Sequence, residues 1–171
     1  GVTNIEITEN GKTTRLAYTS DIGRPVNRLL KSPVAFPQCD YLITESTYGN
    51  RLHHDLDKME SELFEIIHRT CVVKRGKLII PAFAIGRTQE IVYTLNKFFN
   101  EGILPKIDVY VDSPLAVNAT DIFRMHTERL NDEVKEELAR TNDADPFGFN
   151  RLHYIKNVED SKKLNDKTEP C

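Results

Sequence analysis

The chain has 171 residues, of which 39% are hydrophobic and 29% charged, a composition typical of globular proteins with one sizeable core or parts of two. Its formal net charge of −3 lacks the overall positive charge of a nonspecific nucleic-acid binder. A local basic groove is still compatible with this net charge. No apolar run approaches the roughly 20 residues that cross a bilayer, and no secretory signal is recognised, so we expect no membrane partner and a cytoplasmic protein.

The first predicted element is a β-hairpin over residues 4–20. Each arm alternates apolar with polar residues, and the apolar positions are Ile5, Ile7, Leu16 and Tyr18. Between the arms, Asn10 and Gly11 supply the positive φ angles that a type I′ turn needs. A second strand, short and buried, is predicted over residues 39–47.

From about residue 55 the spacing of the apolar residues becomes helical, which predicts a helix with an apolar face of Met59, Leu63, Ile66 and Ile67. The pattern then predicts a buried strand over 77–83, a helix with the stripe Ile91, Val92, Leu95, Phe98 and Phe99, a strand over 107–111, helices over 114–126 and 131–140, a strand over 151–155 and a helix over 158–166. Strands alternate with helices from about residue 42 to 126. This βαβ pattern predicts an α/β fold with a parallel sheet and right-handed crossovers.

Three of the predicted strands end on an acidic residue: Asp21, Glu45 and Asp112. In parallel sheets, ligands collect at the edge where the strands end. The strand before Asp21 fixes its backbone, which suits a metal ligand, but aspartate is also a common turn residue. Glu45 follows a buried strand, where an unpaired charge is costly. It could orient a histidine, accept a proton or hydrogen-bond the next loop.

Two predicted helix starts carry further candidate residues. At Gly86 the free N–H groups, the helix dipole and the Arg87 guanidinium could bind a phosphate, or the segment could be a structural turn with an exposed arginine. It is neither a P-loop nor a G-x-G-x-x-G motif. Ser113 and Pro114 are typical of a helix N-cap and its first turn, and from the residues alone we favour that interpretation.

The histidines and cysteines form no metal motif in the sequence. The five histidines lack H-x-H or H-E-x-x-H spacing, and the neighbours His53 and His54 point apart. The three cysteines are far apart and include no C-x-x-C pair, which argues against a zinc knuckle or a disulfide framework. We therefore expect that the chain does not assemble a histidine metal site by itself.

Taken in order, "YTSDIGRP", "DYLITESTYGNRLH", "GKLIIPAFAIGRTQEIVYTL", "VYVDSPLAVNATDIF" and "PFGFNRLHYI" resemble the metallo-β-lactamase-fold nucleases that carry a β-CASP insertion. This family includes RNA-processing enzymes akin to the cleavage-and-polyadenylation endonuclease. The resemblance implies a fragment of the metallo-β-lactamase domain over residues 1–47, with a β-hairpin and a strand of its αββα sandwich. It implies an incomplete β-CASP domain over residues 48–171, with a Rossmann-like parallel sheet and flanking helices.

The resemblance also implies roles for individual residues. Asp21 looks like the family's strand-end aspartate, which bridges two zinc ions. Glu45 looks like the acidic residue that opens the β-CASP part and helps catalysis through a histidine or the leaving group. Arg87 and Ser113 lie where the family lines its cleft for single-stranded RNA.

The departures from the family pattern concern the remaining metal ligands. The H-x-H-x-D-H signature and other ligand histidines of the family match none of the histidines here, so we expect them before Gly1 and after Cys171. The whole protein would then be a zinc-dependent ribonuclease with two zinc ions, while this segment alone would be inactive and bind no zinc. Three alternative functions are compatible with the sequence: a noncatalytic RNA-binding module, a small-molecule hydrolase of the lactamase fold and a nucleotide-binding α/β domain. The hairpin edge could also pair with a second copy of the chain.

Overall fold

The computed structural model describes residues 2–21, 23, 26–51 and 56–171. The chain divides into two compact units, residues 1–54 and 55–171. The predicted domain boundary between residues 47 and 48 falls inside the first unit and stays a prediction. In the described ranges, no helix is both long and apolar enough to cross a membrane.

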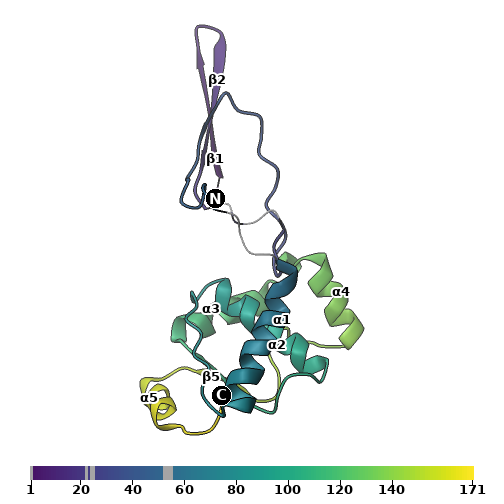
Figure 1. Cartoon of the computed structure of the whole chain (residues 1–171). Helices are drawn as coiled ribbons and strands as arrows, with labels where there is room; N and C mark the ends of the chain where they lie inside the picture. Colours follow the sequence, from purple (N-terminus) through teal and green to yellow (C-terminus); the bar gives the residue numbers. More distant parts are fainter. Residues whose placement is uncertain (1, 22, 24–25, 52–55) are drawn as a thin grey trace. The chain divides into compact units, whose positions relative to one another are not determined.

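The first unit begins with the predicted hairpin, which is confirmed (Figure 1). Strand β1 (Val2–Glu9) pairs antiparallel with β2 (Lys12–Thr19) along the whole length of both strands. At the turn, Asn10 has a φ of 51° and Gly11 a φ of 78°, as the type I′ geometry requires. The two-residue turn thus fixes the register that places Ile5 opposite Leu16.

Strand β3 (Tyr41–Ile43) pairs parallel with β2, with Leu16 opposite Tyr41 and Tyr18 opposite Ile43. The strand predicted over 39–47 is therefore present but shorter, and the prediction that it is buried is wrong, because the Tyr41 side chain is 65% exposed. Paired residues point to the same face of a sheet, so Ile5, Leu16 and Tyr41 share one face with Ile7, Tyr18 and Ile43, whereas Ala17 and Leu42 lie on the other. No second layer of helices or strands covers that face among the described residues of this unit.

The second unit contains five α-helices and one two-stranded sheet in the part of it that the structure describes. In chain order its elements are α1 (Leu56–Ile67), the π-helix η1 (His68–Val73), α2 (Arg87–Asn100), β4 (Val109–Asp112), α3 (Pro114–Met125), the 3-10 helix η2 (Thr127–Arg129), α4 (Asp132–Thr141), β5 (Leu152–Ile155) and α5 (Val158–Asp166). Every helix predicted from the sequence is confirmed, as are the strands predicted over 107–111 and 151–155. Strands β4 and β5 run parallel, with Val109 opposite Leu152, so the predicted α/β class with a parallel sheet is confirmed. The predicted succession of strands and helices over residues 42–126 is wrong, because β3 belongs to the sheet of the first unit and residues 77–83 form no strand.

The core of the second unit forms between α1 and α2, where the two predicted apolar stripes meet. Ile67, Leu95 and Phe98 are buried at its centre, and the Phe64 ring packs edge-on against Phe98 with 5.9 Å between ring centroids. The helical spacing explains this arrangement, because residues three and four apart share one face of a helix. Burial of these side chains stabilises the packing of α1 against α2.

The predicted buried strand over residues 77–83 is wrong. This segment forms no regular strand, and the side chains of Ile79 and Phe83 are 82% and 85% exposed. An apolar run predicts burial, but a strand also needs a neighbour whose N–H and C=O groups face its own. The segment pairs with no strand of the described sheets; instead, the Leu78 N–H donates to the Cys171 carbonyl oxygen at 2.9 Å. A cavity of about 610 Å³ is lined by this segment and by β4.

Candidate functional site

Asp21 and Glu45 follow the carboxyl ends of two neighbouring strands of the first unit. Because β2 and β3 are parallel, both strands end at the same edge of the sheet. One residue beyond the last paired residues, the Thr19 and Thr44 hydroxyl oxygens lie 3.0 Å apart in a hydrogen bond that joins the two strand ends. The sheet therefore positions the two acids at a common edge, although each lies two residues beyond its strand rather than at its last residue.

The surroundings of Glu45 differ from those predicted for the end of a buried strand. The Asp21 and Glu45 side chains are both exposed. The Thr47 hydroxyl donates to Glu45 Oε2 at 2.9 Å, so Glu45 hydrogen-bonds the loop that follows it. An exposed carboxylate at a strand end is solvated without cost, and it stays accessible to a metal ion or a substrate.

The candidate metal-ligating side chains of the described residues are dispersed. No group of three or more histidine, cysteine, aspartate or glutamate side chains comes together among the described residues. Asp21 supplies a single carboxylate, whereas zinc sites take three or four protein ligands. His126 contacts Glu128 and His153 contacts Asp108, both within the second unit. His53 and His54 lie outside the described residues.

Arg87 is the first residue of α2, directly after Gly86. Gly86 has a φ of 85°, a left-handed conformation that favours glycine, and the chain turns there into the helix. Arg87 Nη1 lies 2.8 Å from Glu90 Oε2 in an ion pair one helical turn away, and the arginine side chain is 45% exposed. The guanidinium thus keeps a solvent-facing side, but part of its charge is offset by Glu90.

Ser113 is the N-cap of α3, as its sequence context predicts. Its Oγ accepts a hydrogen bond from the Ala116 N–H at 3.2 Å, and Pro114 occupies the first helical position. Ser113 lines the cavity beside β4, together with Thr88 from the first turn of α2. The structure therefore brings the starts of α2 and α3 to one cavity, which Asp112 at the end of β4 also lines, while Asp21 and Glu45 belong to the other unit.

Two buried amides on α2 were not identified from the sequence. Gln89 and Asn96 are 0% and 2% exposed, and they lie on the same helical stripe as Val92. Gln89 hydrogen-bonds α3, and Asn96 Nδ2 donates to Asp143 and Asp145. A polar residue on an apolar helical stripe is the signal that could have found them, because a buried polar group requires a hydrogen-bond partner.

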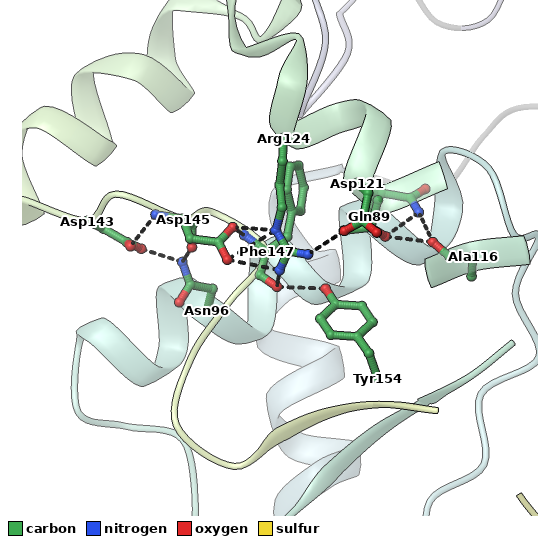
Figure 2. Close-up of polar contacts among 10 residues, drawn as sticks. Gln89, Asn96, Ala116, Asp121, Arg124, Asp143, Asp145, Phe147 and Tyr154 are labelled. Carbon is green, nitrogen blue, oxygen red and sulfur yellow. Dashed lines mark hydrogen bonds and ion pairs between the residues drawn. The ribbon is translucent and has the colours of Figure 1, made fainter. Parts of the chain in front are cut away.

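A second polar network centres on Arg124 of α3 (Figure 2). Its guanidinium donates to both carboxylate oxygens of Asp145 and, at 2.9 Å, to the Phe147 carbonyl oxygen. The Tyr154 hydroxyl donates to the same carbonyl at 2.6 Å, and the guanidinium lies 5.1 Å from the centre of the Tyr154 ring. This network fastens the loop after α4 to α3 and β5. Nothing in the sequence reveals a pair such as Arg124 and Asp145, which are far apart along the chain.

The network also shifts the pKa values of its titratable groups. Burial raises the pKa of Tyr154 to about 12, so its hydroxyl stays protonated and donates throughout the physiological range. Partial burial lowers the pKa of Arg124, but the hydrogen bonds and charge of Asp145 outweigh that effect and the net shift is upward. Both groups therefore keep the protonation states that the network needs.

The sequence matches the family model described as "Beta-Casp domain" over residues 88–171. An RNase J-like protein of Methanocaldococcus jannaschii is 35% identical over 174 residues, which cover 100% of this chain and 38% of the relative. The transcription termination factor FttA of Methanococcus maripaludis is 35% identical over 158 residues, covering 91% of this chain and 24% of the relative. The endoribonuclease YSH1 of Kluyveromyces lactis is 31% identical over 151 residues, covering 85% and 20%. The chain thus spans between 20% and 38% of the length of these relatives.

Proposed function

Because this chain belongs to the β-CASP family of RNA-processing nucleases, we propose that the whole protein hydrolyses phosphodiester bonds of single-stranded RNA. Zinc is the proposed cofactor of the whole protein, with Asp21 as one of its ligands. Glu45 is the proposed acidic group that acts through a histidine or on the leaving group. The chain alone is expected to be inactive, because its five histidines do not follow the family's ligand signature.

The observation that carries this proposal is the common sheet edge of Asp21 and Glu45. Parallel pairing of β2 and β3 and the hydrogen bond between Thr19 and Thr44 bring the two strand ends together. Two acids at one edge can serve different roles, one as a metal ligand and the other in proton transfer. A turn role for Asp21 does not require a second acid at the neighbouring strand end.

A noncatalytic RNA-binding module is the second candidate function. The observation that favours it is the absence of the H-x-H-x-D-H motif from these 171 residues. The two candidates differ in the whole protein: a binding module retains RNA without cleaving it, whereas a nuclease shortens it.

The test uses the full-length protein with Asp21→Asn and Glu45→Gln, each of which removes one negative charge and keeps the shape of the side chain. We expect Asp21→Asn to lower the zinc content measured by mass spectrometry of metals. We expect Glu45→Gln to retain zinc and to slow cleavage of a labelled single-stranded RNA by about a hundredfold or more. RNA binding without any cleavage by the unmodified protein would favour the noncatalytic module instead.

Asp40→Asn is the matched control. Asp40 lies directly before β3, at the opposite end of the strand, and its Oδ2 accepts the Arg15 N–H at 2.8 Å. Its neutralisation changes the charge of the same unit without touching the proposed site. Equal losses in all three variants would mean that Asp21 and Glu45 act through folding rather than chemistry.

A further inference from the structure

The Gln89 side chain is fully buried, and both its Nε2 and its Oε1 are hydrogen-bonded. Its Nε2 donates to the Thr120 hydroxyl oxygen at 2.9 Å and to the Ala84 and Ala116 carbonyl oxygens at 3.1 and 3.4 Å. Its Oε1 accepts the Gly86 N–H at 2.7 Å. Figure 2 shows the carboxamide directed at the carbonyl of Ala116.

These bonds join two segments that are far apart along the sequence. Ala84 and Gly86 belong to the turn that leads into α2 and ends at Arg87. Ala116 lies in the first turn of α3, and its N–H is also capped by Ser113. Gln89 therefore fixes the turn that carries Arg87 relative to the helix start that carries Ser113.

A role in filling space alone does not account for an amide at this position. An apolar side chain of the same length would fill the volume without the cost of burying a polar group. The amide satisfies backbone groups of the turn, the Ala84 carbonyl and the Gly86 N–H, which neither a helix nor a sheet pairs. Its contribution is thus specific to the conformation of this turn.

We propose that Gln89 is a positioning residue for RNA binding, which holds Arg87 in the orientation that contacts a backbone phosphate beside the start of α3. This inference rests on the proposed function, because it requires the whole protein to bind RNA. Gln89 itself is buried and does not touch the RNA; it acts through Arg87. The chemistry recognised is the phosphodiester backbone of a single strand, independent of base sequence.

The test is a double-mutant cycle in the full-length protein with Arg87→Ala, Gln89→Met and the combined variant. Gln89→Met keeps the length of the side chain and removes its amide. Binding of a fluorescein-labelled oligouridine is measured over a range of salt concentrations. We expect Arg87→Ala to weaken binding about tenfold and to make the negative slope of log K against log salt shallower by about 0.7, the value for one phosphate contact on a single strand.

Gln89→Met is expected to make the slope shallower by nearly as much as Arg87→Ala does, and the combined variant is expected to bind no more weakly than Arg87→Ala alone. A positioning role predicts this lack of additivity, since Gln89 has nothing left to orient once Arg87 is removed. A merely structural role predicts an unchanged slope and an additive loss of affinity. The latter result would overturn the proposal.

Asn96→Leu is the control for lost stability. Asn96 is a buried amide on the same helix, and its Nδ2 donates to Asp143 and Asp145, away from the turn at Gly86. We expect it to lower the free energy of unfolding without changing the salt slope. If Arg87→Ala leaves the slope unchanged, the phosphate contact and the positioning role both fail. If Arg87→Ala makes the slope shallower and Gln89→Met does not, only the positioning role fails.

Discussion

At the scale of single residues, Gly148 has the least room for a Cβ atom among the glycines that the structure describes. A Cβ built there would overlap the Asp145 carboxylate, which Arg124 and the Phe147 N–H hold in place. We expect Gly148→Ala to lower the free energy of unfolding by about 1–3 kcal/mol, measured by urea denaturation, because the carboxylate must leave its partners. Gly76→Ala is the control: its Cβ would meet only the Thr70 carbonyl oxygen, at 3.6 Å. Equal losses for both variants would contradict this account.

At the scale of elements, the start of α3 combines an observed cap with a proposed RNA contact. We expect Ser113→Ala to lower the free energy of unfolding by about 1 kcal/mol, because the Ala116 N–H loses its acceptor. Ser113→Asn and Ser113→Asp both restore a capping oxygen, but only aspartate adds a negative charge. In the full-length protein, Ser113→Asp should therefore weaken binding of single-stranded RNA while Ser113→Asn should not, in the same fluorescence assay. Equal RNA affinity for the two would remove Ser113 from the proposed RNA path.

The elements also separate what a sequence can predict from what it cannot. Helix α2 and the β1–β2 hairpin were predictable, because their signals are local: an apolar stripe in one and the Asn10-Gly11 turn in the other. The structure of segment 77–83 was not predictable. Its apolar run indicates a preference for burial, whereas a strand also depends on a partner strand elsewhere in the chain. The hydrogen bonds of Gln89 were not predictable for a similar reason, because folding brings its acceptors on α3 near to it.

At the scale of the whole molecule, the first unit leaves an apolar sheet face uncovered in the part of the chain that the structure describes. The face carries Ile5 and Ile7 of β1, Leu16 and Tyr18 of β2, and Tyr41 and Ile43 of β3. Strand β1 is also an edge strand of this sheet, and a long exposed edge is a template for pairing with another chain. Apolar patches of this kind promote association between protein molecules.

We therefore expect the 171-residue chain to self-associate through its first unit, as a dimer or larger species in sedimentation velocity at rising concentration. Ile7→Lys should shift the distribution toward monomer, because a lysine on an edge strand opposes strand pairing and breaks the apolar face. Ile122→Lys is the matched control, since Ile122 on α3 is 55% exposed and Ile7 is 54% exposed. Both variants add the same charge, so a general effect of net charge would act equally in the two. A monomeric unmodified chain, or equal effects of the two lysines, would show that the exposed face of the first unit does not drive association.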